Sequence, residues 1–408
     1  MIEKYEVLDS LVEESKLPTE RKLKILVINY EYPPIGGGGG VICRDIAEEI
    51  SAIGHKVTVV TSEFKGLEKY EIKNGVEILR VPVFFRSKQN TASLPSMLSY
   101  VPASVSKANE LLSKENYDVI NTHFAIPSGP AGNSISRKFK IPNVLSIHGG
   151  DIFDPSKSMS PHKTIGLKQT VRRMLLNADR VVAQSSDTKK NASTLYNIQR
   201  NIDVVPLGIK PNKFQEKNRK ELGLLENKII FVTVGRLIPR KNLEELIEIV
   251  LRMKKNFGCE LIIIGDGPEK ENLQQIINSL NLSNEIKLVG RVSEELKFQY
   301  LSASDVYLST AIHEGFGIVF LEAMECGLPV ICYDRGGQVD FLTSDETGYL
   351  IKLKDTESFY NNLTYLLNNV DLKERISMSN RELVKKFYIN NIANQYLSIF
   401  EQVVSVKK

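Results

Sequence analysis

The chain has 408 residues, of which 42% are hydrophobic and 25% charged, and its 53 basic and 49 acidic side chains leave a formal charge of +4. At roughly 150 residues per domain, this length predicts two or three domains. The ordinary composition excludes disordered, fibrous and disulfide-stapled proteins. Because the basic residues are spread along the chain, we expect no nucleic-acid partner.

The cysteines and the absence of long apolar runs indicate the compartment. Cys43, Cys259, Cys326 and Cys332 form no CxxC pair and have no histidine at zinc-finger spacing, which predicts buried free thiols and no metal site. Residues 1–22 lack the apolar core of a secretory signal, and no run of eighteen apolar residues occurs. We therefore expect a cytoplasmic protein without a membrane span, able to rest peripherally on a membrane.

In chain order, residues 1–22 have near-helical apolar spacing and predict a helical appendage. Short β-branched runs then alternate with helical segments, which is typical of doubly wound α/β domains. Strands are expected at 24–29, 56–60, 76–83, 118–122, 141–147, 180–184, 229–235, 260–265, 285–290, 305–309 and 329–333. Helices are expected at 41–53, 130–139, 163–178, 243–255, 269–280, 318–326 and 356–369.

This order divides the chain into two α/β halves, expected at residues 23–205 and 206–389. Open α/β sheets bind ligands at the carboxyl ends of their strands, so a cleft between the halves is the expected ligand site. The stretch from about residue 390 to 408 is helical in pattern.

A run of five glycines, residues 36–40, follows the first predicted strand. It does not match a Walker A loop or the dinucleotide pattern GxGxxG, although Glu63 after the second strand could mimic the ribose acid of a dehydrogenase. A flexible surface loop is a further alternative. We favour a loop whose Gly37, Gly38 and Gly39 amides face a phosphate or substrate, because glycines at a strand-to-helix turn expose the backbone.

The most informative stretch is HEGFGIVFLEAMECGLPVICYDRGG, residues 313–337, in which Glu314 and Glu322 lie eight residues apart. Glu314 is expected in a loop and Glu322 on the following helix, positions from which carboxylates can accept sugar and ribose hydroxyls. Upstream, GRLIPRKN places Arg236 and Lys241 directly after a predicted strand, where two cations can neutralise a pyrophosphate.

These motifs, together with GDGP at 265–268 and GRV at 290–292, resemble the retaining glycosyltransferases of family 4. The resemblance covers nearly the whole chain from about residue 23. It implies the GT-B fold, in which two Rossmann-like doubly wound domains face a central cleft. It also implies a nucleotide-sugar donor in the C-terminal domain, an acceptor in the N-terminal domain, and a C-terminal helix that crosses back onto the first half.

The resemblance also implies roles for individual residues of the second half. Arg236 and Lys241 match the diphosphate clamp, Glu314 the carboxylate that contacts the donor sugar, and Glu322 the carboxylate that holds the ribose. The remaining donor-binding positions are Gly235, Val292, Phe316, Gly317, Ile318 and Val319.

In the first half, SIHGGD at 146–151 resembles the family's His-Gly segment. The resemblance implies that His148 lies beside the reacting sugar and makes Asp151 a candidate for acceptor contact. His123 also ends a predicted strand and is a candidate for the acceptor side. An isolated histidine after an apolar strand is otherwise a satisfied structural residue, and this alternative stays open for both histidines.

The predicted chemistry is transfer of a hexosyl group from a nucleotide-diphosphate sugar to an acceptor hydroxyl, in surface polysaccharide, glycolipid or glycoconjugate assembly. No cofactor or metal is expected, because the chain has no Asp-x-Asp motif and two cations can stabilise the leaving diphosphate. Two alternatives remain: a GT-B nucleotide-sugar epimerase, and a non-catalytic sugar-nucleotide-binding subunit.

Two segments mix apolar and basic residues and are compatible with a lipid-linked acceptor or peripheral membrane contact. They are residues 84–107, which include Phe84 and Phe85, and residues 162–176. Ordinary helix packing explains the first segment equally well.

Overall fold

The computed structural model describes residues 21–406, except 88, 90–91 and 157–159. The predicted appendage at 1–22 therefore lies almost entirely outside the described residues. The chain forms two compact units that divide between Gly208 and Ile209 and again between Tyr388 and Ile389.

The first half contains an eight-stranded sheet in the order β3-β4-β2-β1-β5-β6-β7-β8. Every neighbouring pair is parallel except β3 and β4, which are antiparallel. Its strands are β1 (Lys24–Ile28), β2 (Lys56–Ser62), β3 (Tyr70–Lys73), β4 (Val76–Val81), β5 (Val119–His123), β6 (Asn143–Ile147), β7 (Arg180–Ala183) and β8 (Asp203–Val204).

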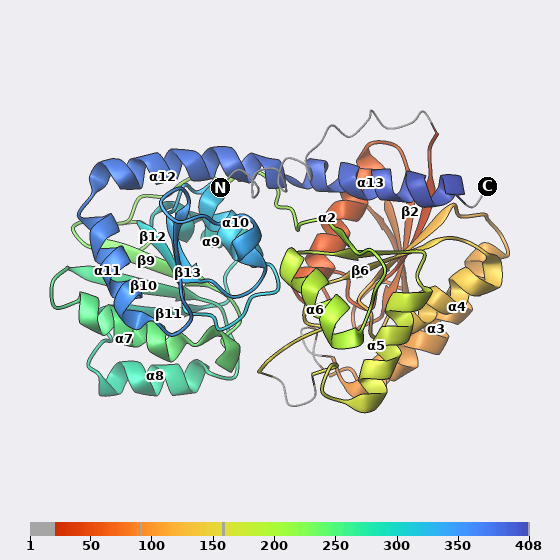
Figure 1. The fold of residues 1–408 in the computed structure, drawn as a ribbon, viewed down its shortest axis with the longest axis horizontal. Helices are drawn as coiled ribbons and strands as arrows, with labels where there is room; N and C mark the ends of the chain where they lie inside the picture. Colours follow the sequence, from red (N-terminus) through yellow and green to blue (C-terminus); the bar gives the residue numbers. More distant parts are fainter. Residues whose placement is uncertain (1–20, 88, 90–91, 157–159, 407–408) are drawn as a thin grey trace. The chain divides into compact units, whose positions relative to one another are not determined.

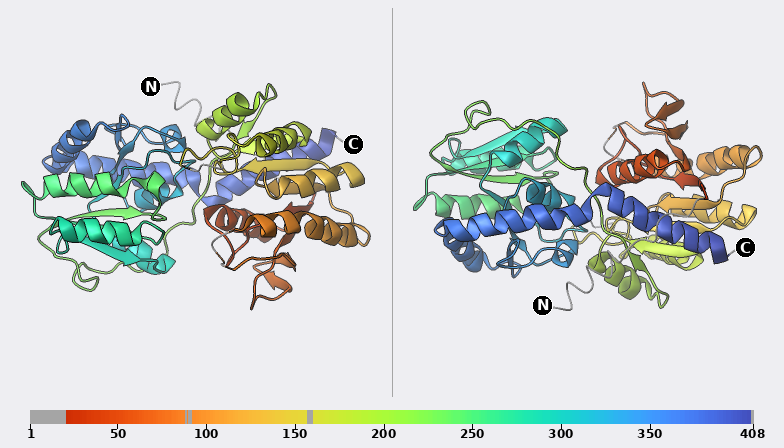
Figure 2. Two further views of the ribbon diagram at one scale, coloured as in Figure 1. Left: turned by 90° about the horizontal axis from the view of Figure 1, so that it is seen from below. Right: turned by 90° about the horizontal axis from the view of Figure 1, so that it is seen from above.

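Helices cover both faces of this sheet, as the first-half ribbon in Figures 1 and 2 shows. Consecutive residues of β1 are buried, so both sides of the strand are covered. Its Leu26 and Ile28 lie in one apolar cluster with residues of α3 and α4, while α2 packs against α13. The helices are α2 (Gly38–Ala52), α3 (Leu94–Leu112), α4 (Gly129–Phe139), α5 (Ile165–Asn177), α6 (Ser186–Tyr196) and α13 (Ile389–Val406).

The second half contains a six-stranded sheet in the order β11-β10-β9-β12-β13-β14, with all neighbouring pairs parallel. Its strands are β9 (Ile229–Val234), β10 (Cys259–Ile264), β11 (Ile286–Gly290), β12 (Val306–Ser309), β13 (Val330–Tyr333) and β14 (Gly348–Ile351). Its helices are α7 (Leu243–Met253), α8 (Lys270–Ser279), α9 (Glu294–Ser302), α10 (Ile318–Glu325), α11 (Thr356–Leu367) and α12 (Val370–Leu383), with short 3₁₀ turns η1 (Pro239–Lys241), η2 (Gly337–Asp340) and η3 (Val384–Phe387).

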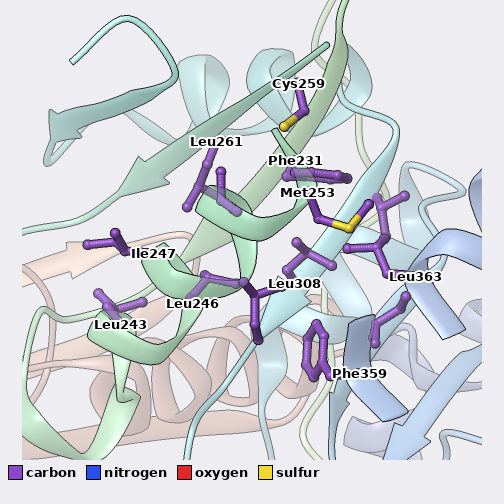
Figure 3. Packing of buried hydrophobic residues seen from close by; sticks show 14 of the residues in the cluster. Phe231, Leu243, Leu246, Ile247, Met253, Cys259, Leu261, Leu308, Phe359 and Leu363 are labelled. Atoms are coloured by element: carbon purple, nitrogen blue, oxygen red, sulfur yellow. The ribbon is translucent and has the colours of Figure 1, made fainter. Parts of the chain in front are cut away.

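The core of the second half lies between α7, α11 and one face of this sheet (Figure 3). Leu246 and Ile247 of α7 pack with Phe231 of β9, and Phe359 of α11 belongs to the same cluster. Burying a side chain of this size stabilises the fold by about 1.5–3 kcal/mol. The packing fixes the start of α7, and with it the preceding turn that carries Lys241.

The structure departs from the sequence-based elements at three strands, four helices and one helix start. The helices α6, α9 and α12 are not among the predicted ones, and helix packing was only one of two alternatives for the segment that contains α3. The strands β3, β8 and β14 were also not predicted: β3 and β8 carry only exposed or half-buried residues, and β14 contains a glycine and a single β-branched residue. The helix predicted from Val41 begins at Gly38. Glycine has a low helix propensity, and here tertiary packing overrides it: a side chain on Gly40 would come within 3.1 Å of the Glu31 backbone.

Candidate functional site

The candidate donor site lies at the carboxyl edge of the second sheet. There β9 is flanked by β10 on one side and by β12 on the other, so the strand order reverses at β9. Such a switch point leaves a crevice at the strand ends where α/β proteins bind ligands. The loop after β9 carries Arg236 and Lys241, and the loop after β12 carries Glu314.

At this edge of the sheet, the Glu314 carboxylate pairs with two cationic side chains. The residue is 6% exposed, and its carboxylate forms ion pairs with Lys241 and with Arg240, the latter at 3.2 Å between Nη1 and Oε2. Burial alone would raise the pKa of the Glu314 carboxyl, but the charges of Lys241 and Arg240 outweigh it and lower the pKa below its usual value. The carboxylate is therefore ionised at neutral pH.

Backbone contacts lock the two loops together around this cluster. The Ile312 N–H donates to the carbonyl of Arg240 at 3.0 Å, and the Thr310 hydroxyl donates to the carbonyl of Asn242 at 2.7 Å. On the other side, the Gly337 N–H donates to the Glu314 carbonyl at 2.8 Å. The carboxylate and its cations are thus held on a preorganised frame.

Two glycines make room for this arrangement. A Cβ on Gly235 would lie 2.9 Å from Cε of Lys241, so the glycine lets the lysine lie across the end of β9. A Cβ on Gly336 would lie 1.8 Å from the Glu314 carbonyl oxygen, and Gly336 has a φ of 119°. An alanine at 336 would be strained and would displace the Glu314 loop.

Glu322 lies on α10 and forms a second, separate ion pair. Its Oε1 accepts a hydrogen bond from Lys297 Nζ of α9 at 2.8 Å, and the two residues are 9% and 8% exposed. Burial raises the pKa of the Glu322 carboxyl, and Lys297 opposes that shift without cancelling it. The other oxygen, Oε2, is buried without a partner among the described residues.

The amides expected to face the donor lie at the start of α10. Gly317 precedes the helix with a φ of 86°, and Ile318 and Val319 open it. The first N–H groups of a helix have no partner within the helix and carry partial positive charge. Phe316 is 2% exposed and packs on Phe341, so it anchors this turn in the core.

Arg236 and Val292 lie in the remaining loops at this edge. Arg236 is exposed directly after β9 and has no hydrogen-bond or ion-pair partner within the described part of the chain. Val292 is half-buried two residues after β11. Arg236 is therefore not one of the ion-pair partners of Glu314, whereas Lys241 is.

In the first half, the two predicted histidines lie side by side at the ends of β5 and β6. Nδ1 of His123 is 2.9 Å from Nε2 of His148, and Nε2 of His123 is 2.8 Å from Oδ1 of Asn121. Burial lowers the pKa of His148 to about 4, and burial with the neighbouring His148 lowers the pKa of His123 well below its usual range. Both imidazoles are neutral at pH 7.

Asp151 holds the backbone next to both histidines by accepting two N–H groups. Its Oδ2 accepts the Ala125 N–H at 2.6 Å and its Oδ1 accepts the His148 N–H at 2.9 Å, and it is 6% exposed. Burial raises the pKa of this carboxyl to about 6. Asp151 therefore ties the loops after β5 and β6 together, and the acceptor contact expected for it stays a prediction.

The glycine run contacts this site through Phe124. A Cβ on Gly39 would lie 2.5 Å from the Phe124 ring, and that ring lies 4.6 Å from the His148 ring, measured between centroids. Gly37 and Gly38 are exposed, and the Gly37 N–H donates to the Glu31 carboxylate at 3.1 Å. One of the amides expected to face an anion thus already has an acidic partner in this chain.

Sequence reasoning missed Arg240, Lys297 and Asn121. Arg240 stands in the same GRLIPRKN segment as Arg236 and Lys241, but only the 3₁₀ turn η1 shows that its guanidinium reaches Glu314. No sequence signal marks Lys297 as the partner of a residue 25 positions away.

No helix in the described part of the chain is long and apolar enough to cross a membrane. Within the same residues, no group of three or more His, Cys, Asp or Glu side chains could hold a metal ion. All four cysteines are free and buried.

Comparisons with known proteins match both halves. The model of Glycosyltransferase Family 4 matches residues 36–213, and that of Glycosyl transferases group 1 matches residues 214–383. TuaC of Bacillus subtilis, a glycosyltransferase attributed to teichuronic acid biosynthesis, is 29% identical over 366 residues, covering 84% of this chain and 88% of TuaC.

Two solved structures share the fold. Sucrose-phosphate synthase from Thermosynechococcus elongatus superimposes with a TM-score of 0.82 at 22% identity, over 95% of this chain and 100% of that chain. HepE of Anabaena in complex with UDP-glucose gives a TM-score of 0.72 at 21% identity, over 93% of this chain and 99% of that chain.

Proposed function

Because the chain belongs to the family 4 and group 1 glycosyltransferases and has the GT-B fold, we propose that it transfers a hexosyl group from a nucleotide-diphosphate sugar with retention of anomeric configuration. An acceptor hydroxyl receives the sugar. The observation that carries this proposal is the buried Glu314 carboxylate held between Lys241 and Arg240 at the switch point of the second sheet.

This cluster suits a donor that is both polyhydroxylated and anionic. The ionised Glu314 accepts hydrogen bonds from sugar hydroxyls, while Lys241 and the unpartnered Arg236 face the diphosphate. The first-turn amides of α10 add partial positive charge. The donor diphosphate competes with Glu314 for Lys241, so this lysine can exchange one anionic partner for another.

The reaction breaks the bond between the anomeric carbon and the diphosphate oxygen and forms a bond from that carbon to the acceptor oxygen. Negative charge grows on the diphosphate as the sugar becomes oxocarbenium-like, and preorganised cations stabilise that charge. The leaving phosphate oxygen takes the acceptor's proton on the same face of the sugar, which retains the configuration. No side chain of this chain is needed as a covalent nucleophile.

Glu322 is proposed to hold the ribose of the donor. Its Oε2 is buried and has no partner in the part of the chain that the structure describes, whereas its Oε1 is oriented by Lys297. A ribose hydroxyl would supply the missing hydrogen bond, and a buried polar atom left without one costs about 1–3 kcal/mol.

Two relatives support the donor and the biological role. HepE was solved with UDP-glucose, and TuaC is attributed to teichuronic acid biosynthesis. We propose a nucleotide-sugar donor for this chain and a role in surface polysaccharide, glycolipid or glycoconjugate assembly. Glu314, Lys241 and Arg236 are all present, whereas a non-catalytic sugar-nucleotide-binding subunit would be expected to lack at least one of them.

The mechanism is tested by the products of donor cleavage, with water as the acceptor. UDP-, GDP- and ADP-hexoses are incubated with the protein, and the released sugar is followed by ¹H NMR before it mutarotates. We expect a nucleoside diphosphate and a sugar with the donor's anomeric configuration. Release of the opposite anomer would contradict a retaining mechanism.

A peripheral membrane contact is proposed for Phe84, Phe85 and the start of α3. Phe84, Phe85, Leu94 and Leu98 are between 56% and 81% exposed, although α3 also buries Tyr100 in the core. Exposed aromatic and aliphatic side chains of this kind insert into the interface of a bilayer.

We expect the wild-type protein to co-sediment with anionic vesicles, and the variant Phe84→Ser/Phe85→Ser to lose most of that binding. Tyr365→Ser is the matched control, because Tyr365 is also 55% exposed but lies in the second half on α11. Equal sedimentation of all three proteins, or none for the wild type at low salt, would refute the contact.

A further inference from the structure

The histidine pair at the end of the first sheet belongs to a hydrogen-bonded row of three side chains, Asn121, His123 and His148. In this row the donor and the acceptor of each hydrogen bond can be assigned. Asn121 and His123 lie on β5, and His148 follows β6. Asn121 is 2% exposed and His123 is 1% exposed, so water does not compete for their hydrogen bonds. The rings of His123 and His148 are stacked, with centroids 5.1 Å apart.

The assignment of donors and acceptors in this row starts from the side-chain amide of Asn121. Its Nδ2 lies 3.1 Å from the carbonyl oxygen of Val144 and 3.1 Å from the hydroxyl of Ser146. A backbone carbonyl can only accept a hydrogen bond, so this side of the amide must be the NH₂ group. The amide oxygen of Asn121 therefore points at Nε2 of His123.

The tautomers of both histidines follow from this orientation. An amide oxygen only accepts, so Nε2 of His123 carries the proton. In a neutral imidazole the other nitrogen is then an acceptor, and Nδ1 of His123 must accept from Nε2 of His148. With its proton on Nε2, His148 has a bare lone pair on Nδ1.

That lone pair has no partner in the described part of the chain. Nδ1 of His148 is buried without a hydrogen bond, although the residue as a whole is only half-buried. Asp151 does not serve it, because its oxygens accept backbone N–H groups and an ionised carboxylate has no proton to donate to a lone pair. The neutral state of both rings agrees with the lowered pKa values of His123 and His148.

We propose that Asn121 and His123 are positioning residues that hold His148 in its Nε2–H tautomer, so that its Nδ1 accepts a hydrogen bond from a substrate hydroxyl. This inference rests on the proposed function for the identity of the substrate. It adds that the group contacting His148 must be a donor. A carboxylate or an ether oxygen beside Nδ1 of His148 could not donate a hydrogen bond, so two acceptors would face each other.

The test reads the tautomer directly by NMR of the full chain labelled with ¹⁵N in its histidine rings. The chain has only five histidines, so the ring resonances are few. In the wild type we expect the proton of His148 on Nε2 and a non-protonated Nδ1. Finding the proton of His148 on Nδ1 would overturn the proposal, whether or not the protein transfers sugars.

Two variants of His123 separate a positioning role from simple packing. His123→Asn can place a carbonyl oxygen near the position of Nδ1 and should keep the His148 proton on Nε2. His123→Leu removes the acceptor and should leave His148 as a mixture of tautomers. If His148 has the wild-type spectrum in the leucine variant, the hydrogen bonds of Asn121 and His123 do not set its tautomer and the proposal is wrong.

Kinetics then identify the substrate that carries the hydroxyl. We expect His123→Leu to raise KM for one substrate by roughly tenfold, the effect of one lost hydrogen bond, and His123→Asn to restore most of it. A rise in KM for the donor alone assigns the hydroxyl to the donor sugar, and a rise for the acceptor alone assigns it to the acceptor. Unchanged KM values in the leucine variant for both would show that no hydroxyl depends on this acceptor.

Discussion

Lys241→Ala is expected to lower kcat for sugar transfer by about 10²–10³-fold, the usual effect of removing one preorganised group that stabilises transition-state charge. Lys241 already lies in ion-pair contact with Glu314 at the end of β9, and it is half-buried. Its charge therefore acts in a site partly shielded from water. Steady-state rates of nucleoside diphosphate release measure the effect.

Lys255→Ala is the matched control for this variant. Lys255 is exposed at the opposite edge of the same half, between the end of α7 and the start of β10, and should leave kcat unchanged. Circular dichroism and the unfolding midpoint show whether Lys241→Ala is folded. A folded Lys241→Ala variant with wild-type kcat would show that Lys241 does not stabilise the leaving group.

Lys297→Met is expected to lower the free energy of unfolding by about 3–5 kcal/mol, because it leaves a buried carboxylate without its partner. Glu322 is only 9% exposed and Lys297 Nζ supplies its hydrogen bond at 2.8 Å. Lys385→Met is the control, since its partner Glu382 and the lysine are both exposed, and such pairs contribute about 0–1 kcal/mol. Urea denaturation measures both variants.

The double variant Lys297→Met/Glu322→Gln separates folding from binding. With the charge removed from both partners, most of the lost stability should return. Donor affinity should stay low, because the proposed ribose carboxylate is gone. Stability that remains as low as in Lys297→Met would show that the loss comes from packing of the lysine stem and not from the unpaired charge.

Elements whose apolar residues follow a clear strand or helix periodicity could be predicted from the sequence, whereas α6 and α12, whose sequences are mostly polar, could not. The run IIFVTVG gave β9, and the periodic apolar positions from Leu243 gave α7. The strand β14 escaped prediction because its residues, Gly348–Ile351, begin with a glycine and include only one β-branched side chain. The antiparallel β3 escaped because its residues are exposed or half-buried.

Motif spacing located the candidate site but did not reveal its internal contacts. The sequence pointed to Glu314 and Lys241 as separate ligand contacts, whereas the structure shows them as an ion pair joined by Arg240. That pairing depends on the turn η1 and on the loop after β12, which lie some 70 positions apart in the chain. The Asn121–His123–His148 chain likewise needs the registration of β5 with β6.

The proposed function requires that the second half bind a nucleotide-sugar donor through Glu314, Lys241 and Glu322. Thermal unfolding with UDP-, GDP- and ADP-hexoses tests it most directly, because a ligand that binds only the folded state raises the unfolding midpoint. We predict that one nucleotide class raises the midpoint of the wild type and that Lys241→Ala and Glu322→Gln lose most of this shift. No shift of the wild type with any of the three classes, or an undiminished shift in both variants, would contradict the claim.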